Sequence, residues 1–233
     1  MATFLVAHGA WSAGWAWKKM HPLMAKGGHR LLTPTYTGLG ERAHLARPEI
    51  DLDTHIADIL GVIEMEDLNG FILIGHSYGG MVATGVAARA HGRVKKLVYL
   101  DAFAPRDGDS ILSLTPDRAS AVREQVAKDG DGWRIAPNPM PSDTSAEDRA
   151  WAMPRRMPQP FKTFEQRISL PGGELTLPRH YIYATRNTPD DRFRQFLERG
   201  RREGWGTSEI DASHNPHITC PDVLMALLDR IAA

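Results

Sequence analysis

Short apolar runs alternate with segments of helical periodicity through the first hundred residues. The strand-like runs lie at residues 3–7, 29–33, 71–74 and 94–100, and the helical segments lie at 15–26, 53–67 and 78–90. The run Phe71-Ile72-Leu73-Ile74 is continuously apolar, which is typical of a central parallel strand buried on both faces. This alternation predicts the α/β class, with a mostly parallel central sheet flanked by helices.

The pattern changes between residues 104 and 178. This stretch holds most of the prolines and several isolated aromatic residues among charged ones, and it does not continue the strand–helix alternation. We interpret residues 104–178 as a lid inserted over the carboxyl edge of the sheet. Regular alternation then resumes with a strand at 180–185, a helix at 191–202, a strand at 206–210 and a helix at 221–231. Residues 1–103 and 179–233 would together form the core domain.

Composition narrows the function classes. Lys+Arg and Asp+Glu number 28 each, so no basic field attracts nucleic acid or anionic lipid, and we expect neither as a partner. No apolar run approaches the roughly 18 residues that a membrane span needs. The single cysteine, Cys220, excludes an internal disulfide and has no zinc-ligand spacing. We expect a cytoplasmic protein without a metal or organic cofactor, in which apolar lid surface could also seat the partner of a homodimer.

A nucleophile motif follows the apolar run at 71–74. The segment Gly75-His76-Ser77-Tyr78-Gly79 matches G-x-S-x-G, with a buried strand leading in and a helix of small residues leading out. The glycines allow a tight turn, so the hydroxyl of Ser77 can project from a strained backbone. This strand–turn–helix context predicts a nucleophile elbow with Ser77 as the attacking residue.

Attack by Ser77 on a carbonyl would create an oxyanion, which needs two preorganised N–H donors. The backbone N–H of Tyr78, directly after the nucleophile, is the first candidate. The second should come from the loop after the first strand, where Ala10 is our choice.

The nucleophile also needs a base and an acid. In folds with a nucleophile elbow of this kind, the catalytic histidine lies after the last strand of the sheet. Two histidines lie there in this chain, His214 and His217. The acid usually follows the penultimate strand, but Asn187 stands there, and Asp190 and Asp191 come slightly late.

An earlier strand supplies another carboxylate. Asp101 directly follows the predicted strand at 94–100, and the carboxyl ends of parallel strands carry the active sites of open α/β sheets. We therefore expect Asp101 to be the acid, with a turn-capping role as the alternative.

These segments resemble one branch of the α/β-hydrolases, that of plant hydroxynitrile lyases, salicylate-binding methyl esterases and bacterial esterase-like relatives. The matching pieces are residues 4–11, 14–17, 75–80, 181–185 and 213–222. Against this tail pattern the family's catalytic histidine falls on His214, seven residues before Pro221, and the family's oxyanion donors fall on Ala10 and Tyr78.

Two departures from the family pattern carry information. The position of the family's usual aspartate falls on Asn187. Asp101 instead resembles the acid of some haloalkane dehalogenases and related hydrolases, which follows the strand after the elbow. Dehalogenases use an aspartate nucleophile, so Ser77 excludes their chemistry here. Asn215 and the Gly9-Ala10 pair replace the lysine and threonine of hydroxynitrile lyases, which argues against cyanohydrin cleavage.

The expected activity is hydrolysis of a small carboxylic ester through an acyl-enzyme. Candidate substrate-binding residues are aromatic and suggest an apolar or aromatic substrate: Trp11, Phe103, Trp133 and Trp151. A lyase or carbon–carbon hydrolase with the same three catalytic residues, and a ligand-binding receptor on the same fold, remain the alternatives.

Overall fold

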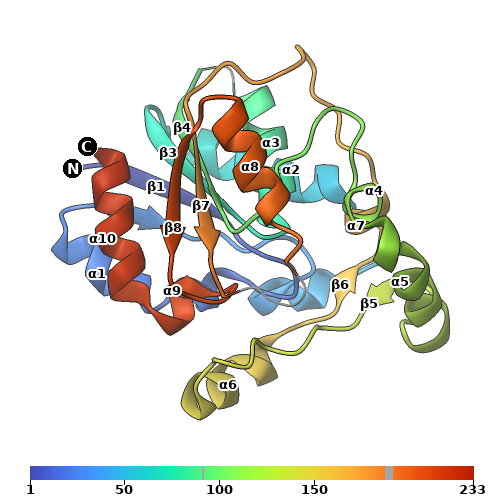
Figure 1. Ribbon diagram of the computed structural model, residues 1–233. Helices are drawn as coiled ribbons and strands as arrows, with labels where there is room; N and C mark the ends of the chain where they lie inside the picture. The colour runs from blue at the N-terminus through green and yellow to red at the C-terminus, as the bar shows by residue number, and fades with distance from the viewer. Residues whose placement is uncertain (91, 187–190) are drawn as a thin grey trace.

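The computed structural model describes residues 1–90, 92–186 and 191–233. Its centre is a six-stranded sheet in the order β2-β1-β3-β4-β7-β8 (Figure 1), in which every neighbouring pair is parallel. The strands of this sheet are β1 Thr3–Ala7, β2 Arg30–Leu32, β3 Phe71–His76, β4 Val94–Leu100, β7 Arg179–Ala184 and β8 Gly206–Ile210. The predicted parallel α/β sheet is therefore confirmed.

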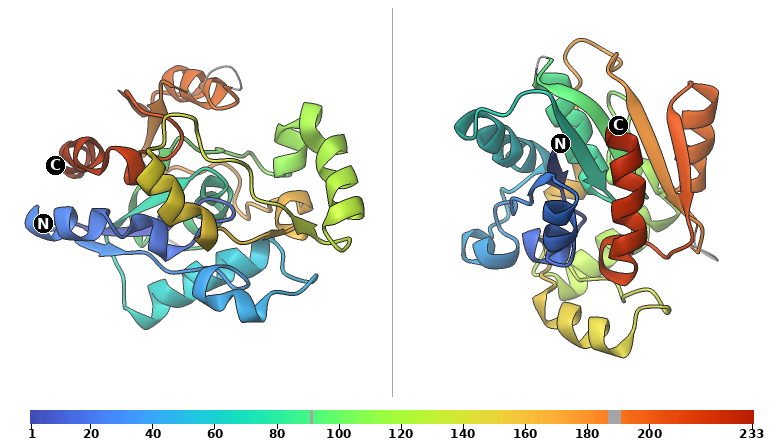
Figure 2. Two further views of the ribbon diagram at one scale, coloured as in Figure 1. Left: turned by 90° about the horizontal axis from the view of Figure 1, so that it is seen from below. Right: turned by 90° about the vertical axis from the view of Figure 1, so that its left-hand side faces the viewer.

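Helices cover both faces of the sheet. α1 (Met20–Lys26) and α10 (Pro221–Ala232) lie on one face, and α2 (Leu52–Met65), α3 (Gly79–Arg89) and α8 (Arg194–Arg202) lie on the other (Figures 1 and 2). Residues within a strand alternate between the two cores, as the period of two requires. In β3, for example, Leu73 belongs to the core under α2 and α3, whereas Ile72 and Ile74 belong to the core under α1 and α10.

Most predicted elements are found within one or two residues of their expected bounds. The main difference is the segment 15–26, where a 3-10 turn at Gly14–Trp17 precedes the shorter helix α1. Pro22 explains the break, because proline is tolerated in the first turn of a helix but clashes with the preceding turn in its interior. Asp51 caps the amino end of α2, since its carboxylate accepts the N–H of Thr54 at 2.8 Å.

Most of the inserted segment, residues 104–178, lies along the carboxyl ends of the strands (Figures 1 and 2), whereas its last part, residues 171–177, lies near Val94 at the amino end of β4. It contains α4 Ile111–Leu114, α5 Pro116–Asp129, β5 Arg134–Ile135, α6 Ala146–Ala152, β6 Gln159–Pro160 and α7 Lys162–Glu165. β5 and β6 form a separate two-stranded antiparallel ribbon. The side chain of Gln166 ties the segment to the core, because it accepts from the N–H of Asp53 and donates to the carboxylate of Asp53.

Among the described residues, no helix combines the length and the apolar character that crossing a membrane would need.

The elbow helix α3 packs against neighbouring backbone without room for side chains. A Cβ on Gly79 would lie 2.0 Å from the carbonyl oxygen of Ala7, and a Cβ on Gly80 would lie 1.9 Å from that of Phe103. These glycines let α3 approach the chain that follows β1 and β4.

We expect Gly80→Ala to lower the free energy of unfolding by about 1–3 kcal/mol or more, because the clash is with backbone and cannot be relieved by a rotamer change. Gly61→Ala is the matched control, since Gly61 lies in α2 with nothing within 4 Å of the added Cβ. The control should gain about 0.5–1 kcal/mol from helix propensity. Urea denaturation measures both, and equal effects of the two changes would contradict this account of the packing.

Several histidines are buried beneath the carboxyl edge of the sheet. His8, His55 and His217 are at most 1% exposed, and burial lowers the pKa of each to about 3. His217 stacks on Trp17, with 4.6 Å between the ring centroids. The folded protein thus holds these imidazoles neutral, whereas the unfolded chain protonates them below about pH 6.5.

Stability should therefore fall as the pH drops from 6.5 toward 5, because the unfolded state binds protons that the folded state excludes. The loss should reach about 1–2 kcal/mol for each buried histidine by pH 5. Urea denaturation at a series of pH values measures it, and His217→Gln, which cannot be protonated there, should reduce the slope. An unchanged slope in that variant would contradict the assignment to His217.

Candidate active site

Ser77 occupies the sharp turn between β3 and α3. Its φ is +55°, a left-handed conformation that residues with side chains adopt only where the surroundings enforce it. The carbonyl of Ser77 accepts the N–H groups of Gly80 (3.0 Å) and Phe103 (3.1 Å). These bonds and the glycine contacts of α3 hold the strained turn, as expected for a nucleophile elbow.

The side chains of Ser77, His214 and Asp101 form one hydrogen-bonded chain. His214 Nδ1 lies 2.7 Å from Asp101 Oδ2, and His214 Nε2 lies 2.8 Å from Ser77 Oγ. A carboxylate oxygen can only accept, so Nδ1 carries the proton and donates it. Nε2 is then the acceptor, and the Ser77 hydroxyl donates to it. The imidazole is thus in the tautomer that can remove a proton from Ser77.

Asp101 is fully buried at the end of β4. Its carboxylate Oδ1 accepts the N–H of Ala184 at 3.1 Å, and its own N–H donates to the carbonyl of Ile182 at 2.7 Å. Both partners belong to β7, the parallel neighbour of β4. The sheet itself therefore places this carboxylate next to the histidine loop.

The other positions considered for the acid, those after β7, do not provide a described carboxylate bonded to His214. The carboxylate of Asp191 interacts with the hydroxyl of Tyr183 (2.5 Å) and the guanidinium of Arg194 (2.9 Å). Asn187 and Asp190 lie outside the described residues. Among the described carboxylates it is Asp101 that reaches His214.

The ring of His214 lies between two other rings. Phe193 stacks on it with centroids 5.0 Å apart and planes 7° from parallel, and the ring of His76 lies 4.9 Å away. His76 Nε2 donates to the backbone carbonyl of His214 at 2.8 Å. Burial lowers the pKa of His76 well below its usual value, so it acts as a neutral donor that holds the histidine loop.

The two candidate oxyanion donors come from adjacent strands. Ala10 follows β1 and Tyr78 follows β3, and these strands pair in parallel up to Ala7 and Gly75. Within the part of the chain that the structure describes, neither backbone N–H donates to a protein acceptor. Both therefore remain available to a bound ligand.

The four aromatic candidates for substrate binding are widely distributed. Trp11 is half-buried next to Ala10, and Phe103 packs edge-on against Phe193, which covers His214. Trp133 packs under the guanidinium of Arg134, and Trp151 packs edge-on against Trp15. Phe103 thus adjoins the hydrogen-bonded chain and Trp11 adjoins Ala10, whereas the ring contacts of Trp133 and Trp151 lie elsewhere.

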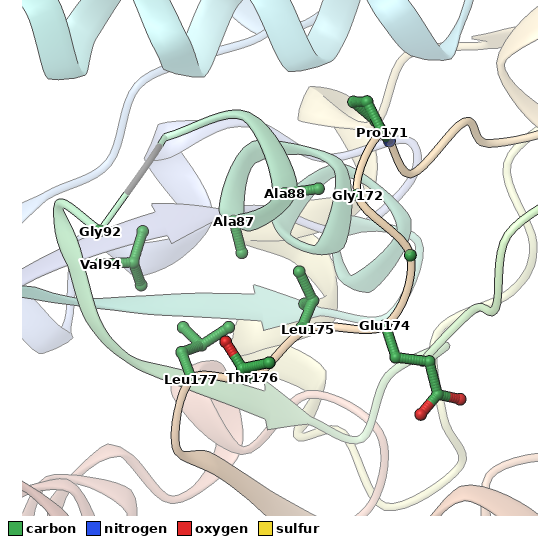
Figure 3. A pocket seen from close by; sticks show the side chains of 11 residues that line it. Ala87, Ala88, Gly92, Val94, Pro171, Gly172, Glu174, Leu175, Thr176 and Leu177 are labelled. Carbon is green, nitrogen blue, oxygen red and sulfur yellow. The ribbon is translucent and has the colours of Figure 1, made fainter.

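Figure 3 shows a pocket lined by residues of α3, β4 and the segment 171–177. Val94, the first residue of β4, lines it, whereas Asp101 follows the last residue of the same strand. The pocket is therefore at the opposite edge of the sheet from Ser77. Among the described residues, no cluster of His, Cys, Asp and Glu has the arrangement of a metal site.

Sequence reasoning missed two residues of the site. Phe193 covers His214, and Gln159 of the inserted segment accepts the backbone N–H of Trp11 at 3.1 Å. Neither lies in a motif, and Gln159 is 148 residues from its partner.

Known proteins resemble this chain along its whole length. A model of the alpha/beta hydrolase family matches residues 4–227. A carbendazim hydrolyzing esterase of Nocardioides sp. (strain SG-4G) is 39% identical over 246 residues, which cover 100% of this chain and 99% of that protein. A pFDCC methylesterase of Arabidopsis thaliana is 24% identical and covers 97% of this chain and 93% of its own.

Solved structures show the same fold. An extracellular alpha/beta-hydrolase from a Paenibacillus species, described as sharing homology with tobacco salicylic acid binding protein 2, superimposes with a TM-score of 0.87 at 23% identity. The match covers 99% of this chain and 98% of that one. The chain therefore belongs to the alpha/beta hydrolase family.

Proposed function

We propose that this protein hydrolyses a small carboxylic ester through an acyl-enzyme formed on Ser77. The esterases among the relatives support a carboxylic-ester hydrolase. The observation that carries the mechanism is the hydrogen-bonded chain from Ser77 through His214 to Asp101.

In the first step, His214 Nε2 takes the proton of Ser77 as Oγ attacks the ester carbonyl. The carbonyl oxygen becomes an oxyanion, to which the N–H groups of Ala10 and Tyr78 donate. His214 then gives the proton to the leaving alcohol, and the acyl group stays on Ser77. In the second step, His214 activates water, which releases the acid and restores the serine.

Asp101 would hold the imidazole by accepting from Nδ1 throughout the reaction. An ionised partner there stabilises the imidazolium that forms while His214 carries the second proton. The bond from Ala184 to the other carboxylate oxygen keeps Asp101 from rotating away.

The inserted segment would act as the lid of this site. Phe164 of α7 packs against Trp11 (5.8 Å) and stacks on Tyr78 (5.7 Å), so the segment places an aromatic ring against one proposed oxyanion residue and against the neighbour of the other. Together with Phe103, these rings favour an ester with an apolar or aromatic group.

Ser77→Ala should abolish labelling by a fluorophosphonate probe and lower the hydrolysis of a 4-nitrophenyl ester by about 10³-fold or more, because the nucleophile is lost. Mass spectrometry of the labelled wild-type protein should place the adduct on Ser77. Product analysis should find an acid and an alcohol in equal amounts. Release of a carbonyl compound would instead indicate a lyase, and a wild-type protein that binds esters without being labelled would indicate a receptor.

Asp101→Asn should lower kcat by about 10³- to 10⁴-fold, because an amide at this position no longer favours the tautomer with the proton on Nδ1. Asp191→Asn is the matched control, since Asp191 bonds to Tyr183 and Arg194 and not to His214. We expect that control to lower kcat by less than about tenfold. A larger effect at Asp191 than at Asp101 would overturn the assignment of the acid.

A further inference from the structure

Trp11 has an unusual backbone conformation for a bulky residue. Its φ is +58°, in the left-handed region where an aromatic side chain is a genuine outlier. Such a conformation persists only where surrounding contacts enforce it, and such positions cluster at functional sites. Trp11 directly follows Ala10, so whatever holds it also acts on the oxyanion loop.

The ribbon formed by β5 and β6 holds Trp11 through both of its N–H groups. The backbone N–H donates to Gln159 Oε1 at 3.1 Å, and the indole Nε1–H donates to the carbonyl of Ile135 at 3.0 Å. Ile135 and Gln159 face each other as one cross-strand pair. One cross-strand pair of the inserted segment therefore binds Trp11, the residue next to the proposed oxyanion donor Ala10.

The side chain of Gln159 is itself fixed in orientation. It is completely buried, and its Nε2 donates to Thr163 Oγ1 at 2.9 Å. The Thr163 hydroxyl donates in turn to the carbonyl of Pro160 at 2.6 Å, so its oxygen is the acceptor for the amide. The amide nitrogen thus faces Thr163, which leaves Oε1 toward Trp11.

The same buried group reaches the second oxyanion residue. Thr163 also lies next to the phenol of Tyr78, and burial raises the pKa of that phenol. The phenol donates to His55 Nδ1 at 2.9 Å, since His55 Nε2–H donates to the carbonyl of Thr37. Gln159 and Thr163 therefore stand between the loop of Ala10 and the side chain of Tyr78.

The amide of Ala10 is supported from both of its sides. The preceding residue is Gly9, where a Cβ would lie 2.8 Å from Nδ1 of His76. A glycine is required there, and its carbonyl, which shares a peptide plane with the Ala10 N–H, accepts from His8 Nδ1–H at 2.9 Å. The bond from Trp11 to Gln159 fixes the peptide plane on the other side of Ala10.

We propose that Gln159 is a positioning residue that holds the Ala10 N–H where the oxyanion forms. Gln159 touches no reacting atom and acts through the peptide of Trp11. The inference rests on the proposed ester hydrolysis, and it predicts that loss of this one bond weakens stabilisation of the oxyanion while ester binding is retained.

The test is Gln159→Met, which keeps the volume and removes the acceptor. Reactive sites are first counted by fluorophosphonate labelling, and kcat for a 4-nitrophenyl ester is expressed per labelled site. We expect kcat to fall roughly 10- to 100-fold with KM within about threefold of the wild type. A trifluoromethyl ketone, whose adduct with Ser77 carries an oxyanion, should bind weaker by about the factor lost in kcat. The matching methyl ketone should change by less than about threefold.

Gln166→Met is the matched control, because Gln166 also joins the inserted segment to the core by two hydrogen bonds but bonds to Asp53. All of its constants should stay within about threefold of the wild type. If Gln159→Met does not fold, the same measurements are made on Thr163→Val, which removes the acceptor of the Gln159 amide. We expect that variant to lose roughly 3- to 10-fold in kcat and in affinity for the trifluoromethyl ketone.

An unchanged kcat and trifluoromethyl ketone affinity in Gln159→Met would overturn the proposal, as would equal weakening of both ketones. A wild-type protein that neither hydrolyses esters nor reacts with the fluorophosphonate would instead overturn the proposed function, so the two failures are distinguishable.

Discussion

The parallel direction of all six strands is the constraint on which the site depends. It brings the carboxyl ends of β1, β3, β4 and β8 to one edge of the sheet, and the next few residues of each chain segment supply a group. Ala10 follows β1, Ser77 follows β3, Asp101 follows β4 and His214 follows β8. Ser77 and His214 are 137 positions apart in the sequence, and they meet because the sheet aligns the ends of their strands.

Strain is concentrated at this same edge. Trp11, Ser77 and Asp101 all have positive φ, from +43° to +58°, and each lies just beyond the end of a strand. Each such conformation costs on the order of 1–3 kcal/mol and persists only where neighbouring structure over-determines it. Backbone bonds to flanking segments supply that determination for Ser77 and Asp101. No neighbouring strand holds the backbone of Trp11 in this way; the inserted segment holds it instead, through Gln159 and Ile135.

Local signals in the sequence predicted most of the fold and the centre of the site. The continuous apolar run of β3 and the G-x-S-x-G segment are both local, so the elbow could be placed from a few residues. The apolar periodicity of residues 15–26 predicts one unbroken helix, whereas Pro22, which has no backbone N–H, marks the break before α1. The partners Phe193 and Gln159 could not be found, since a stacking ring and a buried amide are chosen by three-dimensional proximity and leave no pattern along the chain.

The proposed acid, Asp101, shows how far topology can substitute for a motif. The usual position lies after β7, where this chain has Asn187, but β4 and β7 are neighbours and their ends lie side by side. A carboxylate after β4 therefore approaches the histidine loop from the adjacent strand, and the N–H of Ala184 at the end of β7 orients it. Because that N–H belongs to a strand, the position of the carboxylate depends on the pairing of β4 with β7. The sheet that brings these residues together thus also orients the carboxylate of Asp101, which sets the tautomer of His214.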